Sequence, residues 1–274
     1  MREFRPVIAV LLLVTSTFAC SAFRSRKHSP DLLLTVEIEA TPGERAAALN
    51  ETIAVLESRL NAVGVSNFEV KPYGDPANGR ILISIFGAAN PGRLKSLITA
   101  AGKLELAHVI SPPSPMPCQT FVTKEAAIAS LNQPATNPEN RRVLPYIERA
   151  EIAGGQNKLT NKWVIIELPA IITASDLRTA SAAKASGEEY VIRFALKATA
   201  AERFAAWTAA NINQYLGVVL NDEVRSIAFI KSPISDQGEI SGHFTQQSAE
   251  DLALVLKSGS LPFPIKVVNE STPQ

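Results

Sequence analysis

The chain has 274 residues, of which 46% are hydrophobic and 19% charged, and its formal net charge is +1 at neutral pH. A chain of this length and composition buries a sizeable core, and we expect two domains. Near-neutral charge without long basic blocks argues against a nucleic-acid partner. The two cysteines, Cys20 and Cys118, are too few for a disulfide framework, and no Cys/His cluster has the spacing of a metal site.

The first 20 residues have the layout of an export signal. Arg2 and Arg5 precede an apolar run that ends at the small residue Ala19, directly before Cys20. The run is shorter than the about 20 residues that a membrane span needs. It resembles a bacterial lipobox, in which Cys20 would be lipidated and become the mature N-terminus. A simple cleaved signal and an uncleaved anchor are the alternatives. Residues 21–30 then form a short tether.

Residues 31–110 have the pattern of a β-α-β-β-α-β unit. A capping box at Thr41 opens a helix with one apolar stripe that ends near Gly64, and Asn90 precedes a second helix that runs to Ala100. The expected strands are 32–38, 68–72, 80–86 and 103–110. This order is ferredoxin-like, with Lys103–Ile110 as the closing strand.

Residues 111–255 are expected to form a second α+β subdomain. Its first part, 111–160, is rich in Pro, Asn and Gly, so we expect a loop-rich excursion with one helix at 123–131. Regular patterns then return, with a capping box at Thr199 opening one helix and Thr245 opening another. The expected strands are 162–168, 190–196, 216–220, 224–230 and 240–244, and a further strand at 264–268 follows in the return segment.

Residues 256–274 are expected to form a return strand and tail. Phe263, Ile265 and Val267 need apolar cover after the sharp turn at Leu261-Pro-Phe-Pro264. We expect that cover from the 31–110 unit, so that the second subdomain is an insertion. The fold class is therefore α+β, with a ferredoxin-like base and a second α+β head.

The stretch from Gly238 to Pro264 resembles the periplasmic P1 region of SecD, a membrane subunit of protein export. Matching positions are Ile240, Gly242, Phe244, Thr245, Ala249, Leu252, Ala253, Leu256, Gly259, Leu261, Pro262 and Pro264. The first unit also matches the family, at Thr52, Arg59, Gly64, Val65, Pro91, Arg93, Leu97, Ile98, Leu104, Glu105 and Leu106. The resemblance implies structural roles for Gly242, Phe244, Thr245, Leu252, Ala253, Gly259, Leu261, Pro262 and Pro264.

The resemblance implies a membrane-tethered protein of the bacterial envelope, on the periplasmic or extracytoplasmic side. SecD would continue into membrane helices, whereas this chain ends at Gln274, so we expect a stand-alone member without proton coupling of its own. The implied partners are unfolded secretory polypeptide or Sec translocase components, with the membrane contacted through lipid on Cys20. The alternative is an envelope scaffold or adaptor that kept the fold and binds a different protein or ligand.

The sequence contains no recognisable catalytic site, and we expect neither enzymatic activity nor a cofactor. His108 is in phase with Leu104 and Leu106, which favours a structural histidine facing a core, and His243 is expected at the surface. The tripeptide 154–156 matches a release-factor motif only by coincidence, and the Glu250–Asp251 pair is expected to be solvated. Polypeptide binding is expected in the head, where Phe121, Leu131 and Tyr146 have no periodic assignment.

Overall fold

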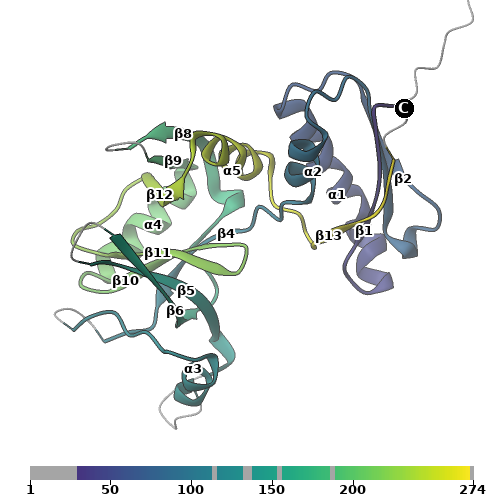
Figure 1. Ribbon diagram of the computed structural model, residues 1–274. Helices are drawn as coiled ribbons and strands as arrows, with labels where there is room; N and C mark the ends of the chain where they lie inside the picture. Colours follow the sequence, from purple (N-terminus) through teal and green to yellow (C-terminus); the bar gives the residue numbers. More distant parts are fainter. Residues whose placement is uncertain (1–29, 113–115, 132–137, 153–155, 186–188, 272–274) are drawn as a thin grey trace, which may run out of the picture.

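The computed structural model describes residues 30–112, 116–131, 138–152, 156–185 and 189–271. Figure 1 shows them as two lobes joined by two passages of the chain. The first lobe contains both the start and the end of the described chain, and the second lobe contains the residues between them. The second lobe is therefore inserted into the first.

The first lobe is a four-stranded antiparallel sheet with two helices. The strand order is β13-β1-β3-β2. Its elements are β1 (Leu32–Ile38), α1 (Pro42–Ala62), β2 (Phe68–Pro72), the short 3₁₀ helix η1 (Pro76–Asn78), β3 (Arg80–Ile85), α2 (Pro91–Thr99) and β13 (Ile265–Ser271). Alternate residues of β1 and β3 are buried against the apolar stripe of α1, which includes Leu49, Leu56 and Leu60.

The fourth strand of this sheet comes from the C-terminal segment. Strand β13 pairs with β1, from Ile265 opposite Ile38 to Ser271 opposite Leu33. The expectation that the first and last segments share a sheet is confirmed. The expectation that Lys103–Ile110 closes the sheet is wrong, because β4 (Leu104–Val109) pairs with strands of the second lobe. The side chains of β4 point alternately into two different hydrophobic cores, as expected for a strand that is buried on both faces.

The second lobe contains a small closed barrel that the sequence patterns did not predict. Its sheet order is β10-β11-β5-β6-β4-β7, and β10 also pairs with β4, which closes the ring. The strands besides β4 are β5 (Arg141–Ile152), β6 (Gln156–Glu167), β7 (Ile172–Thr173), β10 (Tyr215–Leu220) and β11 (Glu223–Phe229). The expected hairpin around Asn221-Asp222 is present, with φ values of 50° and 63° at these residues.

A three-stranded sheet, in the order β12-β9-β8, packs beside the barrel. Its strands are β8 (Leu177–Lys184), β9 (Tyr190–Leu196) and β12 (Gln237–Phe244), and its helices are α4 (Ala198–Ala210) and α5 (Gln246–Ser258). A 3₁₀ helix, η3 (Ala174–Asp176), precedes β8. Lys197 caps α4, so the predicted capping box at Thr199 is wrong, whereas Thr245 caps α5 by accepting from the Ser248 amide.

The segment expected to be loop-rich is largely regular. After α3 (Lys124–Leu131) and the 3₁₀ helix η2 (Pro138–Asn140), β5 and β6 form a hairpin with twelve residues in each strand. Phe121 pairs through its backbone with Trp163, and Leu131, the last residue of α3, is buried. These two apolar side chains are used in a small satellite core on the hairpin.

Candidate functional site

The two passages between the lobes meet at one buried arginine. Arg59 of α1 has no exposed surface. Its Nη1 donates to the carbonyl oxygens of Leu97 and Ile98, both at 3.0 Å, and also to that of Ala100. Its Nη2 donates to the carbonyl oxygen of Gly259 at 3.0 Å. Burial lowers the pKa of Arg59 to about 10, so the side chain is a cation at neutral pH.

Carbonyl groups rather than a carboxylate balance this buried charge. Leu97 and Ile98 lie in the last turn of α2, where unpaired carbonyls carry the negative end of the helix dipole. The second passage is bonded to the first, because the Leu261 amide donates to the carbonyl oxygen of Ala101 at 2.9 Å. Gly102 is required here, since its φ is +70° and a Cβ would lie 2.7 Å from Val255.

An ion pair links the lobes beside this arginine. Arg93 of α2 donates from Nε and Nη2 to Asp251 Oδ1 of α5, at 2.9 and 2.7 Å. Gln247 donates to the same oxygen at 3.0 Å. Asp251 is therefore not simply solvated as expected. Arg59 lies at helical spacing from Leu56 on the apolar stripe, which indicates a buried arginine, but no local pattern indicates its carbonyl partners.

The residues that carry the SecD resemblance follow the chain from the second lobe back to the first. Thr245 caps α5, Leu252 and Ala253 pack in the core of the second lobe, and Gly259 ends the helix with φ +98°. Leu261 is buried in the first lobe, and the Pro264 carbonyl accepts from the Glu39 amide at 2.8 Å. The motif builds the α5 helix and the return passage.

Of the remaining residues that carry the SecD resemblance, Gly242 and Phe244 lie before α5, and Pro262 lies in the turn after it. Gly242 is covered by the ring of Phe244, where a Cβ would come within 2.6 Å of the ring, so only glycine fits without movement. Phe244 packs at the edge of the second-lobe core, and Pro262 lies between Leu261 and Phe263. Structural roles for the motif residues stay a prediction, and Cys20 lies outside the described residues.

An open seam lies between the barrel and the three-stranded sheet. We define the β11–β12 seam as Arg225–Phe229 of β11 and Gln237–Gly242 of β12. The two strands lie side by side, and in the described chain neither is paired with the other. Strand β11 pairs with β5 only at Val224, and β12 pairs only with β9. Both strands therefore present an unpaired backbone edge to the seam.

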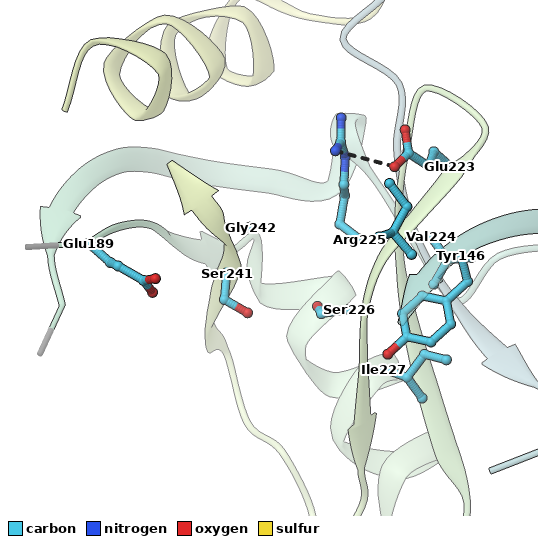
Figure 2. A pocket seen from close by; sticks show the side chains of 10 residues that line it. Tyr146, Glu189, Glu223, Val224, Arg225, Ser226, Ile227, Ser241 and Gly242 are labelled. Carbon is cyan, nitrogen blue, oxygen red and sulfur yellow. Dashed lines mark ion pairs between the residues drawn. The ribbon is translucent and has the colours of Figure 1, made fainter. Parts of the chain in front are cut away.

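The seam is hollowed at both ends. At one end, shown in Figure 2, a pocket of about 220 Å³ is lined by Arg225, Ser226 and Ile227 across from Ser241 and Gly242. Tyr146 borders it from β5, and Glu223 and Arg225 form an ion pair at 3.3 Å. At the other end, a cavity of about 200 Å³ lies between Ala228 and residues 237–239, with the side chains of Phe194, Phe204 and Val218 around it.

The remaining candidate residues do not form a catalytic centre in the described part of the chain. His108 is hydrogen-bonded through Nδ1 to the carboxylate oxygen Oε2 of Glu167 at 2.9 Å, and its ring packs edge-on against Trp207. It faces a core, as expected. Phe204 is 2% exposed and is a core residue. Among the described residues no group of three or more His, Cys, Asp or Glu could hold a metal ion. The side chain of His243 and residues 154–155 lie outside the description.

Comparisons with known proteins agree with this architecture. Residues 149–263 match the model of the SecDF P1 head subdomain. The chain is 33% identical over 222 residues to the protein translocase subunit SecD of Aquifex aeolicus, and 32% identical over 225 residues to that of Koribacter versatilis. These alignments cover 81% and 82% of this chain but 39% of each relative.

Solved structures of SecDF are also similar. A crystal structure of SecDF in a super-membrane-facing form aligns with a TM-score of 0.61 and 25% identity, over 87% of this chain and 30% of that chain. A structure of SecDF, a membrane component that enhances protein export, aligns with a TM-score of 0.57 and 25% identity, over 86% of this chain and 98% of that one. Over the described residues, no helix has both the length and the apolar character needed to cross a membrane. The chain is thus a homologue of the P1-head-containing periplasmic region of SecD and SecDF.

Proposed function

We propose that this protein binds unfolded or newly exported polypeptide through its second lobe. The observation that carries the proposal is the hollowed β11–β12 seam, with an apolar cavity beneath it, in the part of the chain that matches the SecDF P1 head. Unfolded chains offer apolar side chains and free backbone groups. A receptor for them needs an apolar groove or an open sheet edge, and the seam has both.

Binding of an unfolded secretory protein tests the proposal. The purified full chain should bind a reduced, unfolded secretory protein and should not bind its folded, oxidised form. Equal binding of both forms, or of neither, would contradict it and would favour an envelope scaffold or adaptor. An isolated 31–110 fragment is unsuitable for mapping the site, because it would lack β13 and would carry β4 without its partners.

We also propose that the protein is anchored to the bacterial envelope by lipid on Cys20. The support is the signal layout before that residue and the homology to a periplasmic region. Replacing Cys20 by Ser should release the protein from the membrane fraction or leave it unprocessed. Unchanged membrane association of a normally cleaved form would exclude lipidation as the anchor. Docking on Sec translocase components is a further role that the SecD homology supports.

A further inference from the structure

We propose that Phe23, in the tether that precedes the described chain, docks in a cavity of the first lobe and so holds this lobe close to Cys20. The occupant is a segment of the chain itself, and the cavity is separate from the β11–β12 seam. The proposal goes beyond the binding of polypeptide by the second lobe, and its test does not depend on that binding.

The cavity lies between the turn that follows α1 and the turn that precedes α2. We call it the α1–α2 cavity; its volume is about 290 Å³, and it is lined by residues 63–66 and by parts of 86–94. Val63 and Val65 are half-buried in its wall, and Leu94 belongs to the core of the lobe. A cavity of about 150 Å³ with apolar walls holds a benzene molecule. The α1–α2 cavity therefore has room for the ring of a phenylalanine.

The polar side chains at the rim of this cavity are engaged within the protein. Asn90 Oδ1 accepts from the Arg93 amide at 3.0 Å, and Arg93 donates from Nε and Nη2 to Asp251. Among the described residues that line the cavity, Arg93 alone is charged, and its charge is paired. The lining therefore suits an uncharged, apolar side chain better than an ionic ligand.

The described chain begins beside the cavity. The carboxylate of Asp31 accepts hydrogen bonds from the backbone amides of Gly87 and Ala88, the second at 3.2 Å. Gly87 is part of the cavity wall. Phe23 precedes Asp31 by eight residues, which span at most about 29 Å when fully extended. The tether is thus attached at the cavity and is long enough to turn back into it.

The composition of the tether favours Phe23 as the occupant. Phe23 is the only aromatic residue between Cys20 and Leu32, and the six residues that follow it are all polar. Burial of a ring of this size gives a large gain in free energy from a single side chain.

Charge complementarity supports the same arrangement. Three residues of the tether, Arg24, Arg26 and Lys27, are cationic. The first lobe, residues 30–102 and 259–271, contains nine carboxylate side chains and seven cationic ones. The excess of carboxylates attracts the tether to the lobe that carries the cavity.

Docking of Phe23 shortens the free part of the tether. The ten residues from Cys20 to Pro30 span up to about 36 Å, whereas the three from Cys20 to Phe23 span about 10 Å. A docked tether therefore keeps the α1–α2 cavity within about 10 Å of the group that Cys20 carries. With lipid on Cys20, as proposed above, this end of the first lobe lies against the membrane surface.

Hydrogen exchange of the purified full chain tests docking from the side of the tether. Phe23→Ala should raise the exchange rates of the backbone amides of residues 86–94 at least about threefold, because the ring no longer shields the cavity wall. Ser25→Ala, two residues further along the tether, is the matched control and should leave these rates unchanged. Both substitutions precede the described chain, so neither removes a contact within the first lobe.

Photo-crosslinking locates the ring. The photoreactive analogue p-benzoylphenylalanine at position 23 should crosslink to residues 63–66 and 86–94 of the same molecule. Ala89→Trp places a bulky ring in the cavity wall and should lower the crosslinking yield at least about fivefold. Ala62→Trp is the matched control, since Ala62 is also exposed but does not line the cavity. Circular dichroism checks that both variants are folded.

Three results would overturn the proposal. The first is an unchanged exchange rate at residues 86–94 in Phe23→Ala. The second is a set of crosslinks to other parts of the chain or between two copies of it. The third is crosslinking mainly to lipid in vesicles of phosphatidylethanolamine and phosphatidylglycerol, which would show that Phe23 inserts into the membrane. None of these experiments uses an unfolded polypeptide, so a failure here leaves the proposed function of the second lobe unaffected.

Discussion

At the residue scale, Arg59 is the side chain on which the junction between the lobes depends. It is fully buried and donates to carbonyls of both chain passages, so its removal leaves several carbonyl oxygens without a donor. Losing one partner of a buried polar group costs about 1–3 kcal/mol, and more where a charge is involved. The hydrogen-bond partners described for Arg59 are backbone carbonyl groups, so its loss leaves none of them with a formal charge to compensate.

Replacing Arg59 by Met should therefore lower the free energy of unfolding by about 3 kcal/mol, measured by urea denaturation. Arg59→Lys should recover only part of this, because an ammonium cannot reach the carbonyls of Leu97 and Gly259 with the same planar fork. Arg178→Met is the control, since Arg178 is 59% exposed and lies 3.7 Å from Asp236. A loss of stability in the control equal to that of Arg59→Met would show that the carbonyl contacts contribute little.

Glu37 gives a prediction of pH dependence. The hydrogen bond from Arg80 lowers the pKa of Glu37 below its ordinary value of 4.5, burial opposes this, and Lys266 and Arg45 add to the lowering. A carboxyl whose pKa is lower in the folded state stabilises the fold above its unfolded pKa, and this contribution is lost as pH falls through the lowered folded value. The charge thus supports the junction of β1, β3 and β13 at neutral pH.

Glu37→Gln should therefore be less stable than the parent at pH 7, and the difference should shrink as the pH falls below about 4. Urea unfolding midpoints of the two proteins across this range measure it. An equal deficit at pH 7 and pH 3 would mean that Glu37 acts through packing or hydrogen-bond geometry and not through its charge.

At the scale of elements, α5 joins the second lobe to the return passage. Its N-terminus is held by Thr245, whose Oγ1 accepts from the Ser248 amide at 3.2 Å. Ser248 stands where a glutamate would complete a capping box, so Thr245 carries the cap without the reciprocal bond from a glutamate. Thr245→Ala should lower the free energy of unfolding by about 1 kcal/mol, whereas Thr245→Asn should restore most of it. Chemical denaturation measures both, and equal stability of all three proteins would contradict the capping role.

Local patterns predicted most elements and failed where strand partners are distant in sequence. The caps at Thr41 and Asn90, the stripe of α1 and the turn at Asn221-Asp222 are local signals, and each is present. Strand β4 was expected at the right residues but in the wrong sheet. Its partners on β10 are more than a hundred residues away, and alternation shows which residues are apolar without showing which strand pairs with them.

The candidate site was predictable only as a region. Tyr146 had no periodic assignment in the sequence, and in the structure it borders the seam. Ser226, Ser241 and the free backbone edges were not foreseen, because an unpaired edge is a property of the whole sheet and leaves no mark in the side chains. The long hairpin was missed because Pro145 lies in the middle of β5 and breakers surround it.

At the scale of the whole molecule, the question is how firmly the two lobes are coupled. The passages are short and bonded to each other, and one ion pair, Arg93 with Asp251, bridges α2 and α5. Both tryptophans of the chain, Trp163 and Trp207, lie in the second lobe, so their fluorescence reports on that lobe. Circular dichroism reports on both lobes.

A double-mutant cycle measures the coupling. Arg93→Ala, Asp251→Ala and the double variant should give an interaction energy of about 1 kcal/mol, because both Nε and Nη2 of Arg93 contact the carboxylate and each side chain is only about one-third exposed or less. The effect should appear in the tryptophan fluorescence transition, although Arg93 belongs to the other lobe.

The matched control is Lys95 with Glu270, an ion pair of 2.5 Å that lies within the first lobe. Breaking the control pair should shift the circular dichroism transition and leave the fluorescence transition in place, since it joins no residue of the second lobe. If the control pair shifts the fluorescence midpoint equally, the lobes unfold as one cooperative unit, and the coupling extends well beyond the bridge between α2 and α5.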